Sequence, residues 1–387
     1  MIAIALKMLT GNRSKYLGIV LALAFTAFLT TQLPSVLMGI LQRTYSFITD
    51  VGTGDIWVMD PKVQYVDDVK PMRDTELYRV RGIPGVEWAV PIFKGDIRAQ
   101  LRDGTFQDCI LVGLDDATLL GGPANMTQGA VADLRHADGI IVDYDGSRTK
   151  LAKAIPGQPP GQTNPLAIGD ILELNDHRAA VVGVAKIGYN FNSLPVIYTT
   201  YTRAQSYVPA ERKLLSFIIV KVKPGFSHAA LINQIQKATN LAAYPTEDFK
   251  TNSRNWFIKK TGIMVNFSII VIIACIGGGA VAGQTFFTFT LDNLRYFGVM
   301  KAMGTSVWQL VGMVLVQALT AGTIGYGLGM IGVAVSSYFM TGSKVAYHLA
   351  WQTPVVTCIE ILVICSFAAL MSLRQVIRLE PAVVFKA

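Results

Sequence analysis

The stretch TGIMVNFSIIVIIACIGGGAVAGQTFFTFTL, Thr261 to Leu291, contains no Asp, Glu, Lys or Arg. A helix that crosses the hydrocarbon core of a bilayer needs about 20 consecutive, mostly apolar residues. Uncharged stretches in the buried helices of soluble proteins are usually much shorter, about 10 to 14 residues. We therefore expect this stretch to cross a membrane, with the span itself at 262–290.

Three further stretches have the same character. They are Tyr16 to Gln42, Ala302 to Ser343, and Thr353 to Leu373, the last interrupted only by Glu360. The composition of the 387 residues agrees, because 51% are hydrophobic, 16% are charged and the mean hydropathy is +0.41. We predict four transmembrane helices, at 16–42, 262–290, 308–340 and 353–373, with a short external loop at 341–352.

Basic residues beside the spans predict the orientation, because Lys and Arg are enriched in cytoplasmic loops. They are Lys7, Arg13 and Lys15 before the first span, Arg295 and Lys301 between the second and third, and Arg374, Arg378 and Lys386 after the fourth. Both termini, 1–15 and 374–387, are therefore expected in the cytoplasm. The first stretch is too long for a cleaved signal peptide, so we interpret it as an uncleaved anchor.

The segment 43–261 lies between the first two spans and carries nearly equal numbers of basic and acidic residues. Strand-like stretches dominate it, with helical patterns at Asp74 to Arg81, Thr202 to Val208 and Ser227 to Thr239. The Pro- and Gly-rich stretch at 154–165 predicts a loop or junction, followed by a possible β-rich subdomain near 166–200. The predicted fold class is thus a membrane α-helical protein, with a large α+β extracytoplasmic domain inserted between transmembrane helices 1 and 2.

Residue patterns of catalysis are missing from the sequence. The four histidines and four cysteines form no metal-ligand spacing, and neither a G-x-S-x-G turn nor a P-loop occurs. We expect no enzyme, no bound metal and no bound cofactor, so that any ATP hydrolysis belongs to another polypeptide. The sequence pI near 9.2 does not indicate nucleic-acid binding, because the basic excess lies in short segments beside the spans.

The cytoplasmic link LDNLRYFGVMKAMGTSVWQ, 291–309, has apolar residues at three- and four-residue steps. This pattern predicts a short amphipathic helix. The pattern alone is also compatible with a simple connector that lies on the lipid surface.

The sequence RYFGVMKAMGTSVWQL, Arg295 to Leu310, resembles the signature after the second span of MacB-type ABC transporter permeases, also called the FtsX-like permease family. The likeness extends over the whole chain: a basic N-terminal segment, one span, a large external domain, three clustered spans and a tail. The stretch GDIWVMDP, Gly54 to Pro61, and the chain length resemble the DevC-type export branch most closely.

The resemblance implies that the link is a coupling helix, which docks into a groove of a cytoplasmic ABC ATPase. The residues carried over to this role are Arg295, Tyr296, Phe297, Gly298, Met300, Lys301, Ala302, Met303 and Gly304. Many relatives have an acidic residue where this chain has Tyr296. Phe297 and Met300 are therefore expected to be the apolar anchors in the ATPase groove.

The resemblance also implies a location, the inner membrane of a bacterial cell, and it implies partners. They are a second copy of this permease, two ATPase subunits that hold ATP and Mg, a periplasmic membrane-fusion adaptor, and the lipid bilayer. The implied function is export of a hydrophobic or amphiphilic substrate. The alternative is an FtsX-like permease that regulates a cell-wall hydrolase or extracts lipoproteins.

Two features inside the spans have two interpretations each. Gly279 with Gly283, and Gly325 with Gly329, have the G-x-x-x-G spacing that allows close helix contact, either within one subunit or at a dimer seam. Glu360 is an intramembrane carboxyl that must face protein. In a functional interpretation, Glu360 sets the positions of the helices during a transport cycle. In a structural interpretation, its carboxyl is protonated or paired, with His348 or Lys344 as the candidate partner.

Overall fold

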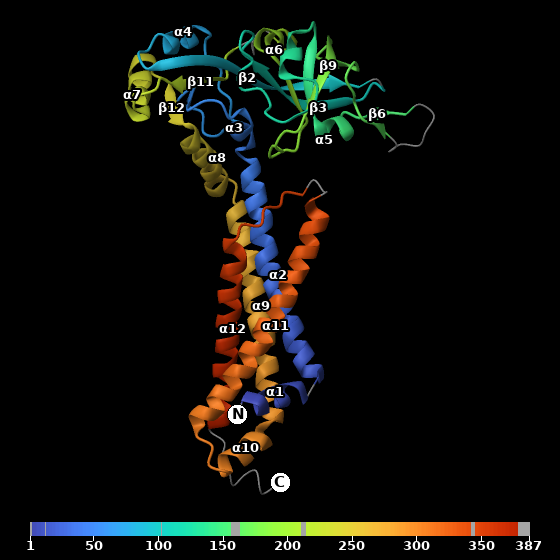
Figure 1. Ribbon diagram of the computed structural model, residues 1–387, viewed down its shortest axis with the longest axis vertical. Coiled ribbons are helices and arrows are strands. Elements are labelled where there is room, and N and C mark those ends of the chain that lie inside the picture. Colours follow the sequence, from blue (N-terminus) through green and yellow to red (C-terminus); the bar gives the residue numbers. More distant parts are fainter. Residues whose placement is uncertain are drawn as a thin grey trace. The chain divides into compact units, whose positions relative to one another are not determined.

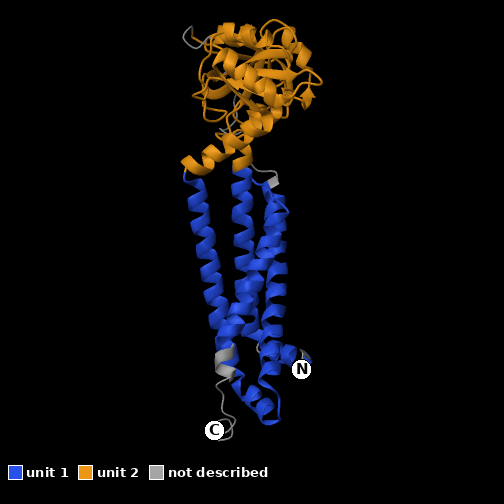
Figure 2. Cartoon of the chain, turned by 90° about the vertical axis from the view of Figure 1, so that its left-hand side faces the viewer, with its two compact units in different colours: residues 1–40, 262–387 blue, residues 41–261 orange. Residues whose placement is uncertain are grey.

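The computed structural model describes residues 2–11, 13–101, 103–155, 163–209, 214–341 and 345–377. Two compact units divide the chain (Figure 2): the membrane unit, residues 1–40 and 262–387, and the external domain, residues 41–261. Lys344 and most of the predicted tail, 378–387, lie outside the described residues.

Four long helices in the described residues confirm the predicted spans (Figure 1). They are α2 (Arg13–Arg43), α9 (Ile263–Asp292), α11 (Val307–Thr341) and α12 (Gln352–Ile377). Contacts between them are made partly by hydroxyl groups, since Thr31 Oγ1 of α2 donates to Thr357 Oγ1 of α12 across 2.9 Å. Lys15 and Asp292 form an ion pair that ties the beginning of α2 to the end of α9.

A short helix that the sequence did not predict, α1 (Ile2–Gly11), precedes the first span. Ala5 and Leu9 are buried, while Ile4 on another side of the helix is exposed. The side-chain amide of Gln317 in α11 donates to the carbonyl oxygen of Ala5 at 2.8 Å. The N-terminal segment is therefore a folded part of the membrane unit.

The external domain is built on a mixed ten-stranded sheet with the strand order β12-β1-β11-β2-β3-β10-β5-β9-β4, in which β8 pairs with β2 and β9. Its strands are β1 (Ile56–Met59), β2 (Val86–Gln100), β3 (Phe106–Leu114), β4 (Met126–Gln128), β5 (Gly139–Asp143), β8 (Ile171–Leu174), β9 (His177–Ala185), β10 (Val196–Thr200), β11 (Phe217–Val222) and β12 (Ala242–Pro245). A separate pair joins β6 (Lys153–Ala154) to β7 (Thr163–Asn164).

One strand, β2, belongs to both halves of the sheet. Its 15 residues form one continuous strand. Its first half pairs with β11, and its second half pairs with β3 and β8. Pro91 and Gly95 do not break it, because the hydrogen bonding passes from one neighbour to the next along the strand.

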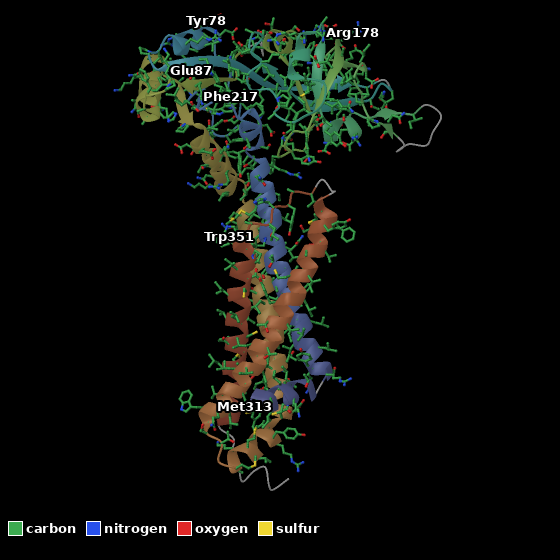
Figure 3. All side chains as sticks on the ribbon, in the orientation of Figure 1. Tyr78, Glu87, Arg178, Phe217, Met313 and Trp351 are labelled. Carbon is green, nitrogen blue, oxygen red and sulfur yellow. The ribbon has the colours of Figure 1, made fainter. Side chains whose placement is uncertain are left out.

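Side chains on both faces of the sheet form the core. At one end of the sheet, the ring of Trp57 packs against the rings of Phe217 and Phe249, with centroid distances of 5.5 Å and 5.6 Å. Phe217 is labelled in Figure 3. The helices are α3 (Ser46–Val51), α4 (Thr75–Arg81), α5 (Tyr144–Arg148), α6 (Tyr201–Tyr207), α7 (His228–Thr239), α8 (Thr246–Lys260) and the 3-10 turn η1 (Val131–Arg135).

The stretch predicted as a possible β-rich subdomain, 166–200, contains the hairpin of β8 and β9, which turn at Asn175 and Asp176 with positive φ at both residues. These strands do not form a sheet of their own. β8 also pairs with β2, and β9 with β5 and β4, so the stretch is a part of the large sheet. Of the predicted loop at 154–165, residues 156–162 lie outside the described residues, while Ala154 pairs with Thr163 in the two-stranded β6–β7 ladder.

Candidate functional site

The cytoplasmic link folds as the predicted short helix, α10 (Leu294–Ala302). It follows α9 after the single residue Asn293, whose side-chain amide donates to the carbonyl oxygen of Phe289 at 2.8 Å. The backbone N–H of Asn293 donates to the same carbonyl at 3.2 Å, so Asn293 closes the end of α9 with both its backbone and its side chain. The chain can therefore change direction within one residue.

Gly304 sets the end of α10. Its φ is +91°, in the region that only glycine enters without strain. The N–H of Gly304 donates to the carbonyl of Lys301, and the N–H of Thr305 donates to the carbonyl of Met300, both at 3.1 Å. These two bonds form a Schellman motif, the usual way for glycine to close a helix.

The next helix begins immediately with a capping box. The backbone N–H of Gln309 donates to Ser306 Oγ at 3.4 Å, and the N–H of Ser306 donates to Gln309 Oε1 at 3.1 Å. The turn between α10 and α11 is thus hydrogen-bonded on both sides.

α10 has a buried face and an exposed face, and the two residues predicted as ATPase anchors lie on the buried face. Phe297 is fully buried, Met300 is 7% exposed and Gly298 is buried. Both large side chains belong to the core of the membrane unit, together with Ala5 and Met313. The expectation that Phe297 and Met300 anchor in an ATPase groove is therefore wrong, because they already fasten α10 to its own bundle.

The other face of α10 is open to a partner. Tyr296 is 61% and Met303 74% exposed, and Arg295, Val299, Ala302 and Gly304 are exposed beside them, with Lys301 partly exposed. Trp308, in the first turn of α11, is 83% exposed. Sequence reasoning missed Val299 and Trp308, although large apolar side chains on a cytoplasmic surface indicate an interaction site. We call Tyr296, Val299, Met303 and Trp308 the coupling face.

The structure separates the two G-x-x-x-G pairs. A Cβ added to Gly325 would lie 2.7 Å from Leu23 Cβ, and one added to Gly329 would lie 2.7 Å from the carbonyl oxygen of Ala24. This pair therefore lies where α11 crosses α2 within one subunit.

In contrast, a Cβ on Gly283 would meet nothing within 4 Å, and one on Gly279 would only touch Ile364 at 4.0 Å. Gly279 and Gly283 lie in an apolar groove of about 760 Å³ between α9 and α12. Because neither glycine has a side chain, a helix from outside this bundle has room to approach the groove.

Glu360 belongs to α12 and contacts the neighbouring helix α9. Cys275 Sγ of α9 donates to Glu360 Oε1 at 2.8 Å. The backbone N–H of His348 donates to the carbonyl oxygen of Ser35 in α2 at 3.0 Å. Lys344, the other predicted partner of Glu360, lies outside the described residues. Within the described residues, the hydrogen-bond partner of the Glu360 side chain is Cys275.

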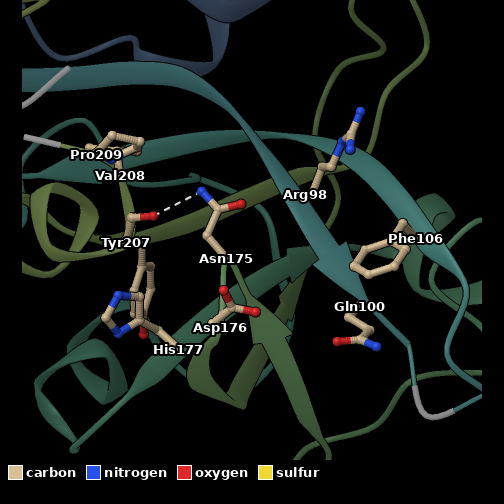
Figure 4. A pocket seen from close by; sticks show the side chains of 9 residues that line it. All are labelled: Arg98, Gln100, Phe106, Asn175, Asp176, His177, Tyr207, Val208 and Pro209. Carbon is tan, nitrogen blue, oxygen red and sulfur yellow. Dashed lines mark hydrogen bonds between the residues drawn. The ribbon is translucent and has the colours of Figure 1, made fainter. Parts of the chain in front are cut away.

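The external domain has an open cleft of about 500 Å³ beside the β8–β9 hairpin (Figure 4). Its wall is fixed by Asn175, whose amide donates to the carbonyl oxygen of Tyr207 at 3.0 Å, and by the His177 ring, 5.7 Å from the ring of Tyr207. Phe106 and Arg98 lie on the opposite side, and Phe106 is 65% exposed. No sequence pattern singled out this cleft, because its residues come from four separate segments.

Asp50 lies in a small cavity between α3 and the sheet of the external domain. Burial raises its pKa from the usual 3.8 to about 6, although the N–H of Gly188 donates to its carboxylate at 3.1 Å. The folded domain therefore holds a proton there at pH values where the unfolded chain has lost it. Stability from this group is complete below about pH 4 and is lost as the pH rises through about 6.

We expect the Asp50→Asn chain to unfold at a higher temperature than the wild type at pH 7.5. The gain is at most about 3 kcal/mol, or roughly 5 °C, since the amide keeps the acceptor for Gly188 without a charge. Calorimetry of the full chain between pH 4 and 7.5 measures the effect. Asp176→Asn, at an exposed turn, is the matched control, and equal pH profiles for wild type and Asp50→Asn would contradict the assignment.

Comparison with known proteins places this architecture in a family. Residues 17–238, more than half of the chain, match the MacB-like periplasmic core domain, and residues 267–381 match the FtsX-like permease C-terminal domain. An uncharacterized ABC transporter permease of Mycobacterium tuberculosis is 22% identical over 320 residues, covering 81% of this chain and 79% of that protein. The likeness to the DevC-type branch stays a prediction.

Other relatives are longer. The macrolide export ATP-binding/permease protein MacB of Burkholderia thailandensis is 24% identical over 52% of this chain and 32% of its own length. A probable syringafactin export ATP-binding/permease protein of Pseudomonas syringae is 25% identical over 64% of this chain and 37% of its own. Among solved structures, the periplasmic region of MacB from Actinobacillus actinomycetemcomitans matches 55% of this chain and 99% of that one, with 12% identity and a TM-score of 0.38.

Both family matches agree with the order of elements, since the first covers α2 and most of the external domain and the second covers the three later spans with α10 between them. The chain therefore belongs to the MacB-like, FtsX-like permease family of ABC transporters.

Proposed function

We propose that this chain is the permease subunit of an export system in which a separate ABC ATPase drives the external domain through α10. The observation that carries the proposal is the coupling face: four large side chains exposed on a link that is itself fastened to the bundle by Phe297 and Met300. A docking helix needs both features, an outer surface that a partner can hold and an inner surface that passes on the force.

The proposed assembly has two permeases and two ATPase subunits, with ATP and Mg bound by the ATPases, and with both permease termini in the cytoplasm. Dimerisation is supported by the groove at Gly279 and Gly283, where a neighbouring helix can approach closely. The proposed substrate is hydrophobic or amphiphilic, which agrees with the names of two relatives, a macrolide exporter and a probable syringafactin exporter. The proposal includes a periplasmic adaptor on the external domain.

A different function on the same scaffold is regulation of a cell-wall hydrolase or extraction of lipoproteins. The large external domain, with its ten-stranded sheet and open cleft of about 500 Å³, favours export, because a signalling role needs only a contact surface. We therefore keep export as the proposed function.

The test is ATP hydrolysis by the purified permease with the ATPase of its own system, in lipid. We expect amphiphilic compounds to stimulate hydrolysis several-fold. Stimulation by a cell-wall hydrolase or a lipoprotein alone, without any response to amphiphiles, would contradict export. Labelling of Met303→Cys by a membrane-impermeant maleimide from the outside of intact cells would contradict the docking assignment and the orientation together.

A further inference from the structure

A hollow of about 330 Å³ lies along α8 in the external domain. Its rim carries hydrogen-bond donors from Gln64, Asn252, Asn255, Trp256, Lys259 and Lys260, and none of its lining residues that the structure describes is acidic. Its volume is at the lower end of the range for small-ligand sites, about 300 to 1,000 Å³. A headgroup-sized anion fits this volume better than a whole amphiphile. We call it the α8 hollow.

Aromatic contacts hold the wall of the hollow in place. The ring of Trp256 stacks on Tyr65 with 4.0 Å between centroids, and Trp256 Nε1 donates to Gln64 Oε1 at 2.6 Å. Beneath it, Tyr244 stacks on Phe249, which is 1% exposed. The donors on the rim therefore stand on a fixed support, which lowers the entropy lost when a ligand binds.

Lys259 and Lys260 differ from three lysines of this domain that are paired with carboxylates. Lys221 is paired with Asp55, Lys153 with Asp170, and on α8 itself Lys250 is paired with Glu247. Within the described part of the chain, neither Lys259 nor Lys260 has a carboxylate within 4.0 Å, and both are exposed. Two adjacent ammonium groups without a counter-charge attract an anion.

The chain places these lysines at the membrane surface. α8 ends at Lys260 and the span α9 begins at Ile263, so the two Cα atoms are at most about 11 Å apart. The headgroup layer adds roughly 5 to 8 Å to each side of the hydrocarbon core, and a lysine side chain reaches across it. Trp256 belongs to the residue type that is enriched at this boundary.

We propose that the α8 hollow binds the phosphodiester headgroup of an anionic phospholipid in the outer leaflet. Lys259 and Lys260 supply the positive charge, and the amides of Asn252 and Asn255 supply neutral donors to the phosphate oxygens. Phosphate is the chemistry that the donors recognise, and the position beside α9 makes a lipid, rather than a free anion, its source. The inference rests on the fold and not on the proposed export function.

The experiment uses the full chain in neutral detergent, titrated with phosphatidylglycerol or phosphatidylcholine and followed by native mass spectrometry. We expect a preference for phosphatidylglycerol that falls roughly 25-fold in the double variant Lys259→Gln/Lys260→Gln, since each basic residue near an anionic surface contributes about 5-fold. Lys259→Arg/Lys260→Arg keeps the charge and is expected to keep most of the preference.

The matched control is Lys223→Gln/Lys237→Gln, which removes two exposed lysines of the same domain that do not line the hollow. An equal loss in this control would show general charge attraction and overturn the proposal. An unchanged preference in Lys259→Gln/Lys260→Gln would also overturn it. Displacement of the lipid by millimolar inorganic phosphate would identify a free-anion site instead and overturn the lipid assignment.

Discussion

A chain carrying Tyr296→Asp and Met303→Asp is expected to insert and fold as the wild type does, but to bind its ATPase roughly 900-fold more weakly, since the losses at the two anchors multiply. Both side chains are more than half exposed on α10, so their replacement removes nothing from the core of the membrane unit. Apolar and aromatic anchors at the centre of an interface contribute about 2 kcal/mol or more each, which is a factor of about 30. Permease-stimulated ATP hydrolysis in nanodiscs and the affinity for the ATPase measure the effect.

Two controls separate docking from folding. Tyr78→Asp makes the same chemical change at a tyrosine that is 67% exposed on α4 of the external domain, labelled in Figure 3, and should leave ATPase binding unchanged. Phe297→Asp places a carboxylate in the core and should lower the yield of folded protein, because a buried unpaired charge costs several kcal/mol. Normal coupling in the Tyr296/Met303 variant would refute the coupling face.

Gly329→Leu is expected to destabilise the membrane unit by about 3 kcal/mol or more. Its new Cβ would lie 2.7 Å from the carbonyl oxygen of Ala24 and 2.8 Å from the Cβ of Ala27, and only movement of α2 can relieve a contact with backbone. Overpacking alone costs about 1–3 kcal/mol in a well-packed core, and here it also separates two spans. Thermal unfolding of the full chain in detergent measures the loss.

Gly283→Leu provides the matched comparison, because the same substitution in α9 meets open space within the chain. We expect this variant to keep the unfolding temperature of the wild type and to lose self-association, measured by light scattering in detergent. Equal destabilisation by both substitutions would contradict the different placement of the two pairs. Unchanged self-association of Gly283→Leu would exclude the α9–α12 groove as the dimer seam.

Much of the fold follows from the sequence because its signals are long and strong. The spans were predictable from uncharged stretches, and strands such as β5 and β11 from short β-branched runs with turn residues around them. α8 was missed because the sequence TEDFKTNSRNWFIKK is largely polar, and it forms a helix by burying only Phe249, Ser253 and Phe257. Tertiary contacts, not an apolar stripe, decide such a helix.

The coupling site shows a different limit. The periodicity of 291–309 correctly predicted an amphipathic helix, but an apolar stripe does not say whether its partner is the same chain or another one. Phe297 and Met300 have the residue types of interface anchors and of core residues alike. Only their place in one core cluster with Ala5 of α1 and Met313 of α11 assigns them to the core, while Tyr296 and Met303 stay exposed.

The unbroken strand β2 limits how the external domain can work. A protein that closes around its cargo like a clamshell needs a flexible hinge between two lobes, and here 15 consecutive residues cross from one half of the sheet to the other within the ladder. Separating the two halves of the sheet would break hydrogen bonds between β2 and both of its neighbours, β11 and β3. The two halves of the sheet are therefore expected to move together, so that any force on the external domain displaces it as one rigid body.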